Sequence, residues 1–254
     1  MARQPAGPPP PPTVQKLRLR YAKRGPLRFA SHRDLARALE RALRRARVPM
    51  AFSAGFSPHP KISYVGAAPT GAASEAEYVE IGLAERRDPE EVRAALDTSL
   101  PPGIDVLECV EALGAGSLAD RIDAATWRVE LPGVAPAELA QAVEAFLAAD
   151  VVTVEKRTKN GLRDIDARPA VASASAAEEA GCAILHMVVR QVTPAVRPDD
   201  VLAALVAVAD LRPPSPPRAV REAQGRLDDN GTVADPLGPD RVASTRCQGE
   251  PATV

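Results

Sequence analysis

The order of the periodic segments along the chain constrains its fold more than any other feature. Residues 14–21 alternate apolar and basic side chains, which is typical of a strand with one buried face. Ser31 can cap a helix that follows, in which Leu35, Leu39, Ala42, Leu43 and Ala46 form a buried stripe up to Pro49. Further strands are predicted at 51–56, 62–66, 77–83 and 104–110, with a second helix at 89–100.

A similar order recurs in the second half without obvious sequence identity. Strands are predicted at 126–131, 151–156, 182–192 and 218–222, with helices at 136–149 and 199–208 and an extended segment at 162–171. Split βαβ units of this order form an antiparallel sheet with helices on one face. The expected fold class is therefore α+β, with two tandem ferredoxin-like (split βαβ) modules over residues 14–112 and 122–224. Disordered tails are expected over 1–13, which is Pro-rich, and over 228–254.

Composition excludes several classes of protein. Hydrophobic residues make up 45% of the 254 residues, which is enough for a buried core. The three cysteines, Cys109, Cys182 and Cys247, lack CxxC spacing, so we expect neither a disulfide scaffold nor a cysteine-based zinc or iron–sulfur site. No metal site and no cofactor are expected. No apolar run approaches the roughly 18 residues of a membrane span. A cytoplasmic protein without a membrane partner is the expectation.

Charge is distributed unevenly along the chain. The formal net charge is −1, yet residues 14–64 carry thirteen Lys and Arg against two acids, which leaves −12 for the remainder. Such asymmetry is typical of proteins that contact nucleic acid. The alternative is a solvated helix face that is balanced by the acidic segment 65–125, which holds thirteen acids against four Arg.

Four arginines of the first helix recur at spacings of four, four and three, and therefore share one face: Arg33, Arg37, Arg41 and Arg44. Six of the chain's eight aromatic residues lie between positions 21 and 78, within or just after this basic region. Aromatic rings that stack on bases, beside arginines that hold phosphates, form many single-stranded RNA sites. The alternative is that these rings belong to the core of the first module.

The stretch from Ser53 to Ser63 predicts a stiff surface loop, because Gly55 permits close backbone approach and two prolines flank His59. We expect residues 57–63 to lie beside the start of the first helix, with His59 and Lys61 in one groove. The candidate RNA- or phosphate-binding residues are Arg33, Arg37, Arg41, Arg44, Phe56, His59 and Lys61. The candidate catalytic residues are His32 and His59, although no spacing rule brings them together.

Three segments resemble the bacterial radical SAM-linked domain family, a family of unknown function. They are residues 23–45, the loop Gly55-Phe56-Ser57-Pro58-His59-Pro60-Lys61-Ile62-Ser63, and residues 68–78. Residues 223–225 and 234–237 resemble the tail of actinobacterial stand-alone members. In that family the domain follows a radical S-adenosylmethionine protein or is encoded as its neighbour. The resemblance therefore implies a radical SAM enzyme as a partner in trans, with RNA as a candidate substrate, and implies no catalytic residue.

The expected function is that of a non-catalytic accessory protein of a radical SAM enzyme, which binds or presents RNA through the basic helix and the stiff loop. The chain lacks the CxxxCxxC motif that would ligate the iron–sulfur cluster, so it is not itself the radical enzyme. Two alternatives stay open: a metal-independent RNA-processing enzyme, as in ferredoxin-like endoribonucleases that cleave CRISPR repeats, and a protein-interaction adaptor. Approach of His32 and His59 in one cleft would favour the enzyme.

Overall fold

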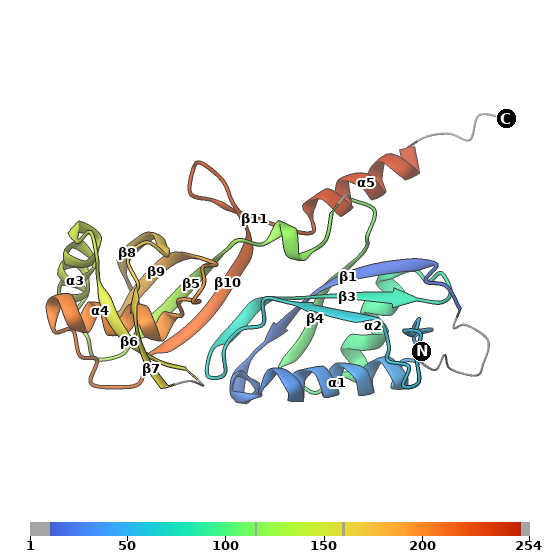
Figure 1. Ribbon diagram of the computed structural model, residues 1–254, viewed down its shortest axis with the longest axis horizontal. Coiled ribbons are helices and arrows are strands. Elements are labelled where there is room, and N and C mark those ends of the chain that lie inside the picture. The colour runs from blue at the N-terminus through green and yellow to red at the C-terminus, as the bar shows by residue number, and fades with distance from the viewer. Residues whose placement is uncertain (1–10, 115, 159–160, 250–254) are drawn as a thin grey trace, which may run out of the picture. The chain divides into compact units, whose positions relative to one another are not determined.

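The computed structural model describes residues 11–114, 116–158 and 161–249 (Figure 1). These residues form a mixed α+β structure with five helices and mostly antiparallel strand pairs. The chain divides into two compact units. Unit 1 comprises the described residues up to Thr70, Glu75–Arg121, and those from Pro236 onward. Unit 2 comprises Gly71–Ser74 and Ile122–Asp235.

Unit 1 is built on the strand order β4-β1-β3-β2. Its elements are β1 (Gln15–Lys23), a 3₁₀ turn (Gly25–Phe29), α1 (His32–Arg45), β2 (Ile62–Val65), β3 (Ala73–Leu83), α2 (Pro89–Ser99), β4 (Ile104–Glu111), a 3₁₀ turn (Ala119–Arg121) and α5 (Gly238–Gly249). β4 pairs with β1, and β2 with β3, in the antiparallel sense. Helices α1 and α2 cover one face of this sheet (Figure 1).

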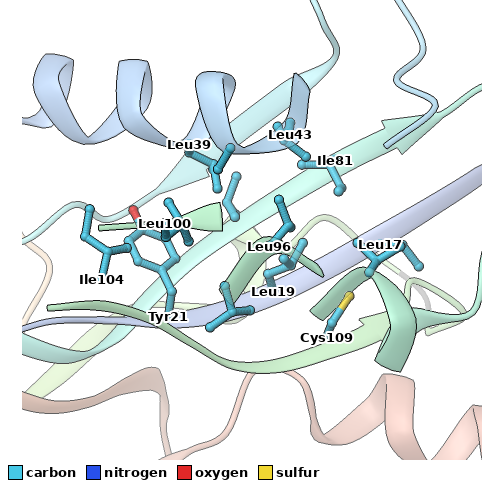
Figure 2. Close-up of a cluster of buried hydrophobic side chains, with 14 of the residues drawn as sticks. Leu17, Leu19, Tyr21, Leu39, Leu43, Ile81, Leu96, Leu100, Ile104 and Cys109 are labelled. Carbon is cyan, nitrogen blue, oxygen red and sulfur yellow. The ribbon is translucent and has the colours of Figure 1, made fainter. Parts of the chain in front are cut away.

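The core of unit 1 lies between that face and the two helices (Figure 2). Leu17, Leu19 and Tyr21 alternate along β1 and point inward, as the period of two requires. They pack with side chains from α1, α2, β3 and β4, among them Leu39, Leu43, Leu96, Ile81 and Ile104. The cluster is apolar throughout, and it holds α1 against the sheet by its buried stripe.

Local sequence explains where α1 begins and which face it buries. Ser31 forms the predicted cap: its hydroxyl accepts a hydrogen bond from the Asp34 amide, while the Asp34 carboxylate accepts one from the Ser31 amide. The buried residues are Leu35, Ala38, Leu39, Ala42 and Leu43, which is close to the predicted stripe. The opposite face of α1 is left for its arginines.

Unit 2 has the strand order β10-β5-β9-β8. Its elements are β5 (Ala124–Leu131), α3 (Pro136–Ala148), β6 (Thr153–Thr158), β7 (Gly161–Asp166), β8 (Val171–Glu179), β9 (Cys182–Arg190), α4 (Pro198–Ala209), β10 (Arg218–Leu227) and β11 (Val233–Ala234). β6 and β7 form a separate two-stranded hairpin, and α3 packs against α4. Ala73 and Ser74, at the start of β3, pair in parallel with Val220 and Arg221 of β10.

Two predicted segments differ in the structure, and one strand was not predicted. Residues 51–56 form no strand, because only isolated bridges occur there, Met50 with Leu83 and Phe52 with Pro60. Of the extended segment predicted at 162–171, only residues 162–166 are strand, in β7 of the β6-β7 hairpin, and β8 follows over Val171–Glu179, where no strand was predicted. β8 escapes sequence reasoning because it is rich in Ala and Ser, which have little strand propensity, and lies at an edge.

The prediction of a disordered tail from residue 228 is wrong for the part of the tail that the structure describes. β11 pairs with β10, and α5 follows from Gly238. Residues 1–10 and 250–254, at the outer ends of the two predicted tails, lie outside the described residues. The Pro- and Asp-rich composition misled the prediction, because β11 is held by strand pairing and the first turn of α5 by polar contacts within unit 1.

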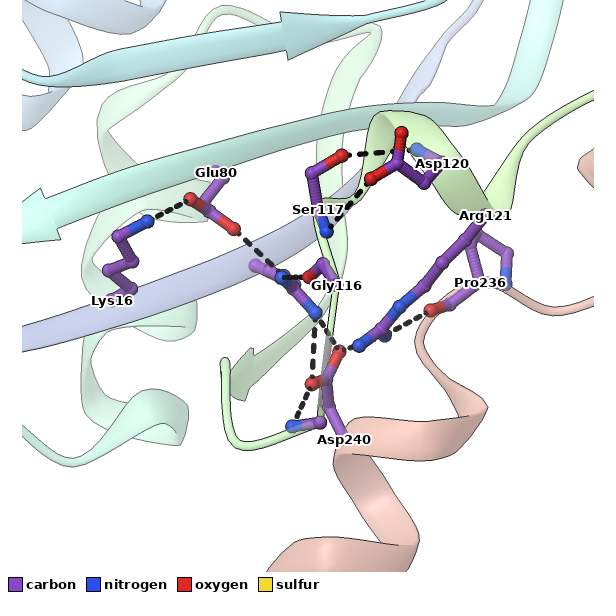
Figure 3. A network of polar contacts seen from close by, with 10 residues as sticks. Lys16, Glu80, Gly116, Ser117, Asp120, Arg121, Pro236 and Asp240 are labelled. Atoms are coloured by element: carbon purple, nitrogen blue, oxygen red, sulfur yellow. Dashed lines mark hydrogen bonds and ion pairs between the residues drawn. The ribbon is translucent and has the colours of Figure 1, made fainter.

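Asp240, in the first turn of α5, is the centre of those contacts (Figure 3). Its carboxylate is fully buried and accepts hydrogen bonds from Arg18 Nη1 at 3.0 Å and Arg121 Nη1 at 2.7 Å. The Gly114 amide donates a third bond, at 2.7 Å. A Cβ on Gly114 would lie 2.7 Å from Arg121 Nη2 and 3.0 Å from Asp240 Oδ1, so this close approach requires glycine.

The same network gives unit 1 a measurable sensitivity to acid. Burial raises the pKa of Glu80, but hydrogen bonds from Lys16 and Arg18 outweigh it and hold that pKa below its ordinary value of 4.5. A carboxyl group with a lowered folded-state pKa stabilises the fold above its ordinary pKa and loses that contribution as pH falls through the folded-state value.

We therefore expect Glu80→Gln to lose less unfolding free energy than the wild type between about pH 6 and about pH 3. Urea denaturation at each pH measures this, with the exposed Glu155→Gln as control. Equal losses in wild type and Glu80→Gln would contradict the expectation.

Within the described residues, no helix is long and apolar enough to span a membrane. A search of the same residues finds no cluster of three or more His, Cys, Asp or Glu side chains that could hold a metal ion.

Candidate nucleic-acid interface

The outer face of α1 carries the four predicted arginines, Arg33, Arg37, Arg41 and Arg44, here called the arginine row. All four are exposed. The carboxylate of Asp34, the one acid near the start of the row, accepts hydrogen bonds from the Ser31 amide and hydroxyl at the helix cap. Glu40 meets only Arg44, with 3.8 Å between Glu40 Oε2 and Arg44 Nη2. In the described structure Arg33, Arg37 and Arg41 form no ion pair, so the row keeps a surplus of positive charge.

Several other basic residues of the same region form contacts within the fold. Arg18 is buried between Glu80 and Asp240. Arg24 forms ion pairs with Glu75 and Asp105, and these carboxylates raise its pKa. Lys23 is fully buried, and its ammonium donates to the carbonyls of Ala68 at 3.4 Å and Pro69 at 3.1 Å. The positive charge counted over residues 14–64 therefore includes a structural part, on β1 and at Arg24, and an exposed part on α1.

The predicted stiff loop is closed by its own hydrogen bonds. The Ser53 amide donates to the His59 carbonyl at 2.8 Å, and the His59 amide donates to the Ser53 hydroxyl at 3.0 Å. Outside this pair, the Lys61 amide donates to the Ala51 carbonyl at 2.8 Å. Residues 53–59 thus form a closed turn whose base is fixed to the sheet of unit 1.

A cavity of about 470 Å³ lies between this loop and the second half of α1. Its polar walls are Glu40, Arg44 and His59, and its apolar walls include Phe52 and Tyr64. We call it the loop pocket. Its complete lining is Glu40, Leu43, Arg44, Met50, Phe52, Pro58, His59, Pro60, Ile62 and Tyr64. The loop therefore meets the end of α1, rather than its start as the sequence suggested.

The two candidate histidines occupy different places. His59 lines the loop pocket, whereas His32, at the start of α1, is not part of its lining. The His32 ring instead packs edge-on against the Tyr64 ring, with 5.0 Å between centroids. Tyr64 also lines the pocket, and its burial, together with the charge of Glu40, raises the pKa of its hydroxyl. No contact in the described structure joins the histidines directly.

Lys61 and Phe56, the remaining predicted residues, both lie outside the lining of the loop pocket. Lys61 is exposed, and its ammonium donates to the Thr13 hydroxyl at 2.8 Å, so it is absent from the pocket lining. Phe56 stands at the tip of the loop with 70% of its surface exposed. Of the aromatic residues between positions 21 and 78, Tyr21 and Tyr78 are core, while Phe29, Phe52 and Phe56 are exposed. The core interpretation therefore holds for Tyr21 and Tyr78, and base stacking stays a hypothesis for the exposed rings.

Sequence reasoning missed three pocket residues: Glu40, Phe52 and Tyr64. Glu40 lies one helical turn before Arg44, and this spacing indicates that the two side chains lie next to each other on one face of α1. Phe52 and Tyr64 gave no such signal, because their positions depend on the bridge from Phe52 to Pro60 and on the register of β2.

Comparison with known proteins gives a family but no activity. No curated protein matches the chain. Among solved structures, a crystal structure of an unknown protein from Galdieria sulphuraria matches with 17% identity and a TM-score of 0.24, covering 77% of this chain and 92% of that one. The family model described as "Uncharacterized protein conserved in bacteria (DUF2344)" matches residues 16–198. Since that match spans more than half of the sequence, the chain belongs to this family of uncharacterized bacterial proteins.

Proposed function

We propose that unit 1 binds single-stranded RNA through the arginine row and the adjacent loop, as a non-catalytic accessory protein. The observation that carries the proposal is the exposure of four arginines on one helix face with a single acid in contact. Other exposed or half-buried arginines, such as Arg93, Arg121 and Arg128, do pair with acids. Three of the four arginines in the row form no ion pair in the described structure, so they are available to phosphates.

The geometry of the row suits a single strand. Eleven residues of α-helix separate its ends, or about 16 Å at the usual rise, so several phosphates of one strand can lie along it. Phe56 and His59 stand on the loop at one end of the row, and exposed rings of this kind stack on unpaired bases. Phosphate contacts would supply affinity, and the loop would supply base contacts.

The proposal assigns no reaction to the chain itself. His32 packs against Tyr64 and His59 lines the loop pocket, so the pairing of the two histidines that would favour the RNA-processing alternative does not support it here. The chemistry would come from a radical SAM enzyme in trans, as the family resemblance implies. The first and third resembling segments meet in unit 1, since Lys23 and Glu77 both bind the backbone of Ala68. The second, the loop, lines one pocket with Glu40 and Arg44 of the first.

We also infer that each unit is a ferredoxin-like split βαβ module. The strand order β4-β1-β3-β2 of unit 1 and the order β10-β5-β9-β8 of unit 2 support this inference, because the strands correspond by position in the chain. The β6-β7 hairpin would then be an insertion between the first helix and second strand of unit 2.

Fluorescence anisotropy with a labelled single-stranded RNA tests the proposal. With about five phosphate contacts, the slope of log affinity against log salt should be about −3 to −4. Replacing Arg37, Arg41 and Arg44 with Ala removes about three contacts and should flatten the slope by about 2. The matched control replaces Arg157, Arg163 and Arg212, three exposed arginines of unit 2, and should leave the slope nearly unchanged. Equal slopes in wild type and the α1 variant would reject the role of the row.

A further inference from the structure

We propose that the loop pocket selects a guanine base of the bound strand. This inference rests on the proposed function and adds to it a base-specific subsite. The pocket joins an aromatic wall, a carboxylate and two nitrogen donors within one cavity of unit 1, and that combination matches guanine better than any other RNA base.

The size and walls of the pocket fit a nucleobase. Its volume of about 470 Å³ falls within the range of small-molecule sites, roughly 300–1,000 Å³. Phe52, still 41% exposed, lies on the loop side, and the apolar side chains of Met50 and Ile62 complete the lining. A flat ring can therefore stack on Phe52 while its faces are shielded from water.

The polar groups of the pocket match the edges of guanine. Among the four RNA bases, only guanine presents two N–H donors side by side, N1–H and N2–H, which one carboxylate accepts in a bidentate manner. Glu40 is the carboxylate available, because its one ion pair, with Arg44, is 3.8 Å long. Guanine O6 and N7 are acceptors, for which arginine is the commonest protein partner. Arg44 and His59 provide donors for that edge.

Arg44 also connects the pocket with the arginine row. It belongs to both, since it is the last member of the row and lines the pocket. A strand whose phosphates follow the row from Arg33 toward Arg44 thus brings a base to the pocket mouth. Phosphate binding along α1 and base selection at its end are then parts of one continuous site within unit 1.

The pocket is organised before any ligand binds. The two Ser53–His59 hydrogen bonds fix the loop that carries Pro58 and His59, and the Phe52–Pro60 bridge fixes the position of Phe52. Tyr64 is held from the other side by the His32 ring and by a long hydrogen bond of 3.4 Å from its hydroxyl to the Ala36 carbonyl. Such walls lose little conformational entropy on binding, which favours a specific site.

Anisotropy with three labelled RNAs tests this inference: an oligouridine of about eight nucleotides, and the same strand with one central guanine or one central adenine. The wild type should bind the guanine strand about tenfold more tightly than the other two. Glu40→Gln should abolish that preference, because an amide offers one acceptor instead of two. It should also bind oligouridine slightly more tightly, because a negative charge beside the row is removed.

Glu144→Gln, an exposed change on α3, is the matched control and should keep the guanine preference. Equal binding of all three strands by the wild type would overturn the guanine subsite while leaving RNA binding intact. A preference for guanine that survives Glu40→Gln would also overturn it. Absence of binding to every strand would instead remove the proposed function on which the inference rests.

Discussion

Replacing Asp240 with Ala is expected to lower the free energy of unfolding by about 3–5 kcal/mol, since it removes the buried anion that two guanidinium groups share. The Asp240 carboxylate is fully buried and holds both Arg18 and Arg121. Without it, two guanidinium groups would face each other in a site with little water. The first turn of α5 would lose its attachment to unit 1, and urea denaturation measures the loss.

A matched control distinguishes this effect from the simple loss of an acid near the C-terminus. Asp229→Ala removes an exposed carboxylate from the same tail and should change the unfolding free energy by no more than about 0.5 kcal/mol. Limited proteolysis should cut the Asp240→Ala variant within α5 well before it cuts the control. If the two variants proved equally stable, the network would not be what holds α5.

Lys23→Met is the second change for which we expect a large effect, about 3 kcal/mol of destabilisation. Lys23 and Glu77 are both buried, and both bind the backbone at Ala68: the lysine ammonium donates to its carbonyl, and the Ala68 amide donates to the Glu77 carboxylate. Removing the cation leaves the carbonyls of Ala68 and Pro69 without that donor inside the fold.

A double-mutant cycle separates the charge effect from the loss of packing. If Lys23 and Glu77 compensate each other, Lys23→Met combined with Glu77→Gln should cost less than the sum of the single variants, by about 1–3 kcal/mol. Chemical denaturation of the four proteins gives this coupling energy. Strictly additive costs would show that the two groups hold the Ala68 segment independently.

Local signals made α1 the most predictable element. Ser31 and Asp34 at the correct separation fixed its start, and the leucines at helical spacing fixed its buried face. The arginine row followed from the same periodicity, because residues that are not on the apolar stripe must face outward. These inferences needed only neighbours within a few turns of one helix.

Features that depend on distant partners were not predictable in this way. Arg18 looked like one more cation of a basic strand, but it bonds to Asp240, 222 residues away. The same separation concealed α5, whose attachment depends on polar groups that composition alone suggests are solvated. Lys61 was assigned to a groove with His59, although its ammonium turns to Thr13 on a segment expected to be disordered.

The candidate site likewise has one part that the sequence predicts and one part that it does not. Its helical part could be predicted, because Arg37, Arg41 and Arg44 share a face by spacing alone. Its pocket could not be, because Tyr64 and Phe52 reach it through strand register and an isolated bridge. The loop was expected beside the start of α1, but it lines a pocket with Glu40 and Arg44 of the second half of that helix.

Photocrosslinking tests the central claim most directly. The full chain is irradiated with a single-stranded RNA that carries 4-thiouridine and one guanine, and the adducts are mapped by mass spectrometry. RNA binding through α1 and the loop predicts adducts on peptides containing Phe52, Phe56 or His59, and their loss when Arg37, Arg41 and Arg44 are replaced with Ala. Adducts confined to unit 2, or adducts unchanged in that variant, would contradict the account.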